Sequence, residues 1–194
     1  MSQIKKILLF FLIWRLIDFL IIYLTPKFIP YLGFFPYKDQ LASFHLPHWL
    51  NSLANFDGIH YLSIAHQGYG QWKQAFFPLY PILIRLFTFV FGNELIFGLV
   101  ISNLSFLVGL LVFSKLFNFK FQISNFKSSS NDKFLNKENF FWLLFFILTF
   151  PTSFFFGAVY TEGLFFLLFA LTLYFLKKEN YWLVSLFGQG YFVG

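Results

Sequence analysis

The feature that most constrains this chain is a series of apolar runs of 17 to 21 residues separated by short polar pieces. A helix needs about 20 mainly apolar residues to cross the hydrocarbon core of a bilayer. Of the 194 residues, 58% are hydrophobic and only 11% are charged. These values predict an integral membrane protein built from α-helices.

We predict an all-α polytopic helical bundle that forms a single transmembrane domain. The predicted spans cover residues 7–24, 97–117, 140–157, 160–176 and 181–194. No small-residue cleavage site follows the first run, so we expect a retained anchor and not a removed signal peptide. Arg15 and Asp18 lie three residues apart in this run, which favours an intrahelical ion pair. Pro151 predicts a kink in the third run.

The placement of lysine residues indicates how residues 75–92 lie. The lysines form three groups, which are Lys5 with Lys6, five residues from Lys115 to Lys137, and Lys177 with Lys178. The positive-inside rule places all three groups, and the N-terminus, on the cytoplasmic side. They share one side only if residues 75–92 do not cross, so we predict an interfacial or re-entrant helix over residues 76–92. The net charge of +6 is then a topology signal, and no nucleic-acid partner is expected.

In this topology residues 25–92 form a large outer loop that carries interfacial helices. Its first part, residues 25–53, is rich in Pro and aromatic residues, which predicts an irregular segment along the membrane interface. A short helix is predicted over residues 57–67, with Asp57 as its N-cap and a stop at Gly68. Asp57 and Glu162 then fall on the same outer side of the membrane. An acid at the start of an apolar run is a candidate functional residue.

Each candidate residue also has a purely structural interpretation. Asp57 could act only as a helix cap. Glu162 could pair with Arg15 or Arg85, and His60 could be a buried imidazole with its hydrogen bonds satisfied. The local sequence leaves these alternatives open.

No metal or cofactor site is predicted. The chain has no Cys, so thiolate ligands are excluded. His60 and His66 are six residues apart, about 240° round a helix, and are poorly placed to share one metal ion.

Three blocks of the sequence resemble the PIG-V family, which comprises GPI mannosyltransferase II and its microbial relatives within the GT-C superfamily. The blocks are DGIHYLSIAHQGY at residues 57–69, FFPLYP at residues 76–81 with Arg85, and FPTSFFFGAVYTE at residues 150–162. They occur in the family order. Phe56 stands where the family commonly has Trp. Members are considerably longer, so we expect residues 1–194 to be the N-terminal part of a longer enzyme.

The resemblance implies an inverting glycosyltransferase that moves a sugar, mannose by family, from a polyprenyl-phosphate donor to an acceptor outside the cytoplasm. Asp57 matches the acid of the family by position, which implies a general base. The implied substrate-binding residues are His60, Tyr69, Arg85, Tyr160 and Glu162. Relatives with monophosphate carriers generally need no metal, so no cofactor is expected. The expected partners are the lipid-linked donor, a lipid or glycan acceptor and membrane lipids.

The setting and two alternative functions stay open. A GPI precursor as acceptor implies the endoplasmic reticulum of a eukaryote, whereas a lipid, cell-wall glycan or protein acceptor fits the plasma membrane of a prokaryote. An ion-coupled transporter could use Asp18 and Glu162, but it would call for acids near the midplane and two corresponding halves. A non-catalytic membrane fragment or scaffold is compatible with the short length.

Overall fold

The computed structural model describes residues 2–29, 37–118 and 137–189. Within these ranges the chain forms helices and turns, with no strand. Gln3–Phe28 and Glu94–Leu116 are long and apolar enough to cross a membrane, and the bent pair Phe140–Thr149 and Pro151–Gly157 is a third candidate. The predicted all-α membrane fold is confirmed. Residues 190–194 of the last predicted span, and most of the lysine-rich connection, lie outside the described residues.

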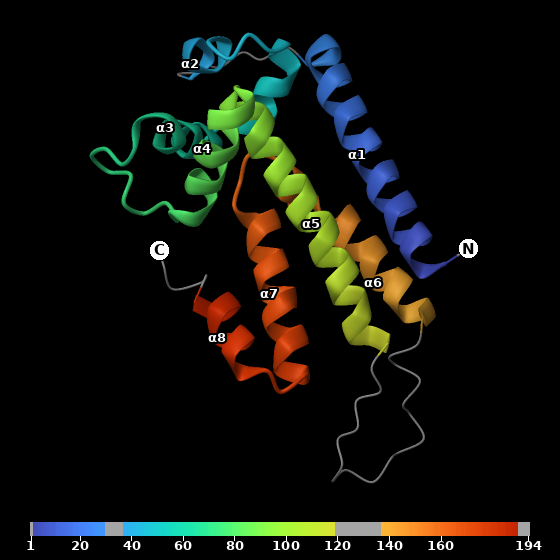
Figure 1. Cartoon of the computed structure of the whole chain (residues 1–194). Coiled ribbons are helices and arrows are strands. Elements are labelled where there is room, and N and C mark those ends of the chain that lie inside the picture. The colour runs from blue at the N-terminus through green and yellow to red at the C-terminus, as the bar shows by residue number, and fades with distance from the viewer. Residues whose placement is uncertain (1, 30–36, 119–136, 190–194) are drawn as a thin grey trace, which may run out of the picture.

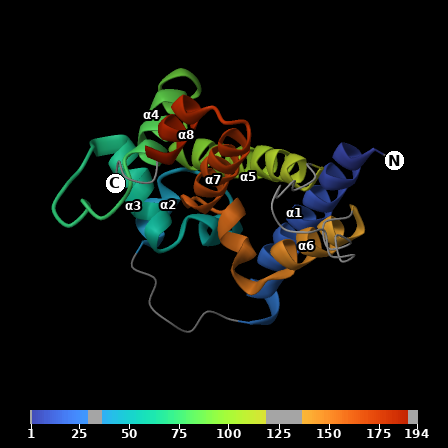
Figure 2. The ribbon, with the colours of Figure 1, turned by 90° about the horizontal axis from the view of Figure 1, so that it is seen from below.

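Five of the described helices form a bundle with α5 at its centre. Its members are α1 (Gln3–Phe28), α5 (Glu94–Asn118), α6 (Lys137–Thr149), α7 (Glu162–Lys177) and α8 (Tyr181–Gln189). Seen from below, α1 and α6 lie on one side of α5, and α7 and α8 lie on the other (Figure 2). The side chain of Ser2 caps α1 by accepting a hydrogen bond from the backbone N–H of Lys5.

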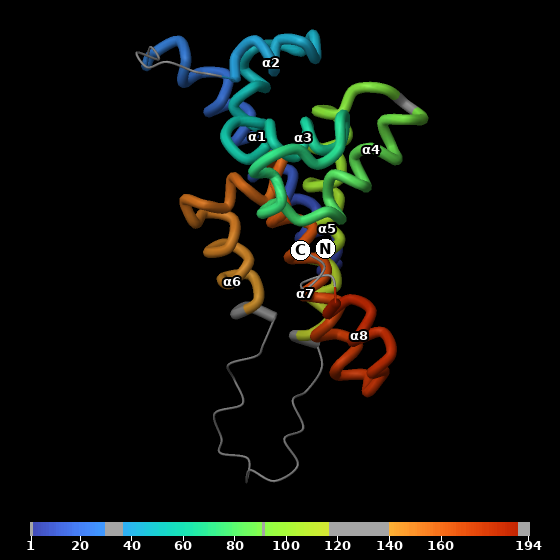
Figure 3. Tube along the Cα trace, turned by 90° about the vertical axis from the view of Figure 1, so that its left-hand side faces the viewer, coloured from blue at the N-terminus to red at the C-terminus, as the bar shows by residue number. Residues whose placement is uncertain are grey.

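The helices that lie between α1 and α5 in the chain gather at one end of this bundle and form a cap (Figures 1 and 3). The cap comprises α2 (Lys38–Ala42), the 3₁₀ helix η1 (His48–Ala54), α3 (Asp57–Gln67) and α4 (Leu79–Phe91). The N-terminal ends of α5 and α7 point toward the cap, whereas Lys5, Lys115 and Lys177 lie toward the opposite ends of their helices. All of α4 therefore stays at the cap end and folds back along α5.

The segment predicted as one span over residues 140–157 is sharply bent. Helix α6 stops at Thr149, and the 3₁₀ helix η3 (Pro151–Gly157) continues at an angle of 87°. The reason is Pro151, which has no N–H to donate and whose ring blocks a continuous α-helix. The bend carries the chain across the bundle and delivers Glu162, the first residue of α7, to the cap end.

Helices α5 and α7 approach closely because Gly163 lacks a side chain. A Cβ atom there would lie 2.5 Å from the carbonyl oxygen of Ser102. An apolar core then joins the cap to the bundle. It includes Ile59 and Leu62 of α3, Tyr80 of α4 and Val159. The position of α3 is thus set by the same contacts that hold the start of α7.

Candidate active site

Asp57 is the first residue of α3 and directly follows a strained residue. Phe56 has φ 51° and ψ −115°, a region that residues other than glycine rarely adopt. Such strain costs about 1–3 kcal/mol and clusters at functional sites. The predicted N-cap is corrected, because the helix starts one residue earlier, with Phe56 as N-cap and no side-chain cap hydrogen bond. The exposed Asp57 side chain is accessible to a substrate.

The segment before α7 is bonded to the chain just before Asp57. The N–H of Val159 donates to the carbonyl oxygen of Leu53 at 2.7 Å, and the Tyr160 hydroxyl donates to the carbonyl oxygen of Asn55 at 2.8 Å. Tyr160 is buried. These two hydrogen bonds join residues more than 100 positions apart and place the starts of α3 and α7 side by side.

Glu162 has a half-buried carboxyl group with an open bonding position. Its Oε2 atom is buried and has no hydrogen-bond partner among the described residues. Leaving such an atom unpaired costs about 1–3 kcal/mol. Arg15 pairs with Asp18, so the structural alternative in which Arg15 is the ion-pair partner of Glu162 is not realised. A substrate hydroxyl would satisfy the free oxygen.

Tyr61 of α3 contacts Thr161, the residue just before Glu162. Its hydroxyl is 3.4 Å from Oγ1 of Thr161. Burial is the main cause that raises the pKa of Tyr61, and the nearby charges of Glu162 and Asp57 raise it further, while the contact with Thr161 lowers it. Tyr61 therefore stays protonated at neutral pH. The charges of both acids act on Tyr61, so Asp57 and Glu162 both lie near it.

A buried network of hydroxyl groups holds this arrangement in place. The hydroxyl of Tyr80 lies 2.9 Å from the carbonyl oxygen of Gly98 and 2.7 Å from Oγ of Ser102. Ser102 in turn donates to the carbonyl oxygen of Tyr160 at 2.9 Å. The network links α4, α5 and the segment before α7. Tyr80 therefore lines the site, and its hydroxyl group is already engaged in hydrogen bonds.

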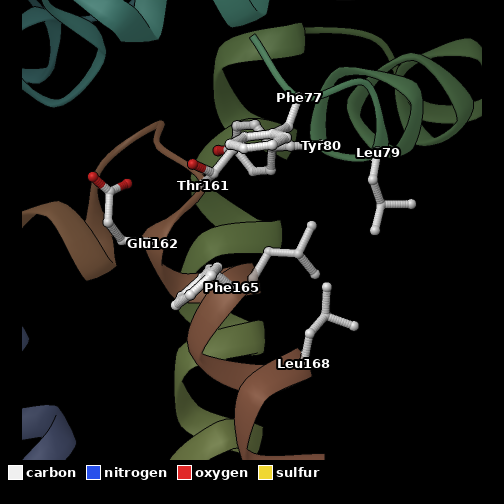
Figure 4. A pocket seen from close by; sticks show the side chains of 8 residues that line it. Phe77, Leu79, Tyr80, Thr161, Glu162, Phe165 and Leu168 are labelled. Atoms are coloured by element: carbon white, nitrogen blue, oxygen red, sulfur yellow. The ribbon is translucent and has the colours of Figure 1, made fainter. Parts of the chain in front are cut away.

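A mainly apolar groove between α4 and α7 leads away from Glu162 (Figure 4). It is lined by Phe77, Leu79, Tyr80, Thr161, Glu162, Leu164, Phe165 and Leu168. Thr161 and the Glu162 carboxylate lie toward one end, whereas Phe165 and Leu168 continue along α7 toward the other. One polar end and one apolar end match a molecule with a polar head and a hydrocarbon tail.

The remaining predicted site residues are more peripheral. The His60 ring contacts the rings of Tyr37 and Phe76, with centroid distances of 5.8 and 5.1 Å. The Tyr69 hydroxyl donates to the carbonyl oxygen of Phe76 at 2.7 Å. Arg85 is exposed on α4, and no described contact joins it to either acid. The structure thus brings together Asp57, Tyr160 and Glu162, and leaves Arg85 apart.

Several polar residues of the site were missed by the sequence reasoning. Tyr61 and Thr161 lie within the quoted blocks but carry no charge to single them out. Ser102 had a usable signal, since it is a polar residue inside an apolar run. Lys73, which bonds Oγ of Ser63, adds a cation beside α3. Among the described residues no group of three or more His, Asp or Glu could hold a metal ion.

Comparison with known proteins gives one family. A family model described as Mannosyltransferase (PIG-V) matches residues 4–190, a range that includes every site residue named above. No curated protein and no solved structure matches the chain significantly.

Proposed function

Because the chain belongs to the PIG-V mannosyltransferase family, we propose that it transfers mannose from a polyprenyl-phosphate carrier to an acceptor on the outer or luminal face of a membrane. Family and apolar helices together make it a membrane glycosyltransferase. The observation that carries the finer proposal is the buried oxygen of Glu162, which has no hydrogen-bond partner among the described residues and lies at one end of an apolar groove. The segment just before Glu162 is bonded to the chain just before the exposed Asp57.

Asp57 acts as the general base in this mechanism. The acceptor hydroxyl oxygen attacks the anomeric carbon of the donor while its proton passes to the Asp57 carboxylate. The bond between that carbon and the phosphate oxygen breaks, and the polyprenyl phosphate leaves with the electron pair. Attack from the face opposite the leaving group inverts the anomeric centre.

Glu162 and its neighbours position the reactants. The free Oε2 atom accepts a hydrogen bond from a sugar or acceptor hydroxyl, which removes the cost of the unpaired carboxylate. The Tyr160 hydroxyl bonds the Asn55 carbonyl and so holds the start of α3 beside the segment that leads to Glu162. Holding reacting groups in this way lowers the entropic part of the barrier.

The donor phosphate needs positive or hydrogen-bonding partners. His60, Tyr69 and Arg85 are the proposed ones, and Lys73, which bonds Ser63 of α3, is a further candidate cation. Since Arg85 is exposed on α4, its role requires the phosphate to lie toward the exposed side of that helix.

The architecture suits a donor that stays in the bilayer. The isoprenoid chain can remain among lipids and the apolar groove, while the sugar reaches the acids under the cap. The lysines at the far ends of α1, α5 and α7 support a cytoplasmic N-terminus and an outer or luminal site. The transporter alternative loses support because Asp18 is ion-paired with Arg15.

The test compares Asp57→Asn with the wild type in mannose transfer from a polyprenyl-phosphate donor, using the full-length gene product. Loss of a general base should lower turnover by about 10²- to 10⁴-fold. Asp39→Asn is a matched control, because Asp39 is an exposed acid at the start of α2 and should be silent. Undiminished transfer by Asp57→Asn would reject Asp57 as the base.

A further inference from the structure

Arg15 is a buried charge in the first membrane helix that contacts more than its ion-pair partner. Only 5% of its surface is exposed. Nη1 lies 3.0 Å from Oδ2 of Asp18, and Nη2 donates to the carbonyl oxygen of Gly157 at 3.2 Å. The guanidinium group also lies over the rings of Trp14 and Phe19. Arg15 therefore ties α1 to the end of η3.

The Gly157 carbonyl is a junction of three elements. Besides Arg15 of α1, it accepts a hydrogen bond at 3.0 Å from Nδ2 of Asn103, which belongs to α5. Gly157 itself has no room for a side chain, because a Cβ atom would collide with the Arg15 guanidinium group. Two donors and a close approach fix this peptide group in space.

The fixed peptide group lies directly before the segment that sets the active site. Val159 and Tyr160 follow Gly157 and bond to the chain that precedes Asp57. Glu162 opens α7 two residues later. A shift of Gly157 would therefore change the position of Glu162 relative to Asp57.

Stability alone does not account for the buried pair. Removing charges from water is costly, and well-packed apolar residues often stabilise a protein as well as a buried ion pair does. What an Arg–Asp pair adds is direction, since the guanidinium group has fixed donor geometry. That geometry is used here on the Gly157 carbonyl.

We propose that Arg15, oriented by Asp18, is a positioning residue. Through the Gly157 carbonyl it holds Glu162 at its position relative to Asp57. For the effect on catalysis, the inference rests on the proposed glycosyl transfer. We call the contact of Arg15 with the Gly157 carbonyl the clamp. Its effect on the structure can be measured without any activity.

The test uses spin labels on the cap and on α7. Residues 1–194 contain no Cys. With any further Cys of the full-length protein replaced by Ser, Gln67→Cys and Phe169→Cys, both at exposed positions on α3 and α7, give one labelled pair. The distance distribution is measured in the full-length protein in bilayer nanodiscs. The variant Arg15→Met is combined with Asp18→Asn, which avoids an unpaired buried carboxylate. Asp18→Asn alone keeps the guanidinium group but removes the carboxylate that orients it, so it should give a smaller shift than the double variant.

We expect the double variant to shift or broaden the distance distribution and to lower turnover per folded enzyme about tenfold to hundredfold, as small misplacements of reacting groups do. Arg15→Lys, which keeps one charged donor, should restore part of both losses. Should the double variant fail to fold, Asn103→Leu removes the other donor to the same carbonyl without exposing a buried charge and should shift the distance likewise.

Wild-type distances and wild-type turnover in the folded variants would overturn the clamp. A changed distance with unchanged turnover would overturn the positioning role in the reaction. If the wild type transfers no sugar, the proposed function fails, and the distance measurement still decides whether the clamp exists.

Discussion

At the scale of single residues, Glu162 offers a test in which stability and activity move in opposite directions. Its Oε2 atom is buried and has no hydrogen-bond partner in the part of the chain that the structure describes. Glu162→Gln removes the charge and keeps the shape, so the thermal midpoint in detergent should hold or rise. The weaker acceptor should lower kcat/KM by about 10- to 100-fold, the equivalent of one charged hydrogen bond of about 1.5–3 kcal/mol.

The matched control for this prediction is Glu179→Gln, which removes an exposed acid from the turn after α7. It should leave both kcat/KM and the thermal midpoint near the wild-type values. A fall of both quantities in Glu162→Gln would indicate a structural acid, and the substrate role would have to be abandoned.

The acids could be found from sequence, whereas their neighbours could not. A charge beside an apolar run is a local signal, and it singled out Asp57 and Glu162. The contact of Tyr61 with Thr161 joins residues 100 positions apart, and no local sequence pattern predicts it. The positive φ of Phe56 was equally invisible, because no local pattern marks a residue other than glycine that adopts it.

At the scale of elements, the close packing of α5 and α7 depends on Gly163. In Gly163→Ala the new methyl group would meet the carbonyl oxygens of Ser102 and Phe156, at 2.5 and 2.9 Å. Backbone atoms cannot yield without moving a helix, so we expect a loss of about 1–3 kcal/mol in unfolding free energy. Thermal or denaturant unfolding in detergent measures it.

Gly188→Ala in α8 is the control for this packing test. The nearest atom to its new Cβ would be 3.9 Å away, an ordinary contact. Replacing a helical glycine with alanine should then stabilise the protein by about 0.5–1 kcal/mol. Equal effects of the two substitutions would mean that α5 and α7 are not in close contact at Gly163.

Helix ranges followed from sequence more readily than helix directions. Apolar periodicity and the stop at Gly68 are local, and α3 occupies the predicted range of residues 57–67. Pro151 predicted a kink, but the 87° turn depends on what η3 packs against. The hydrogen bonds from Arg15 and Asn103 to Gly157 hold the far end of η3, and such long-range partners are not encoded in a local pattern.

At the scale of the whole molecule, the proposal requires both acids to lie on one side of the bilayer, opposite the N-terminus. The cap holds α3 and α4 at the end where α7 begins, and the lysines of α1, α5 and α7 lie toward the other end (Figure 1). Clusters of positively charged residues beside membrane helices stay on the cytoplasmic side. The cap should therefore lie on the outer or luminal side.

Single cysteines test this arrangement in a chain that has none. Cysteines replacing Asp57 and Glu162 should react with a membrane-impermeant maleimide from the outer side of intact cells, with Glu162 slower because it is half-buried. Cysteines replacing the exposed Ser2 and Glu179 should react only after permeabilisation. Labelling of positions 57 and 162 from opposite sides would mean that α4 crosses the bilayer, and two acids so separated could not act on one sugar.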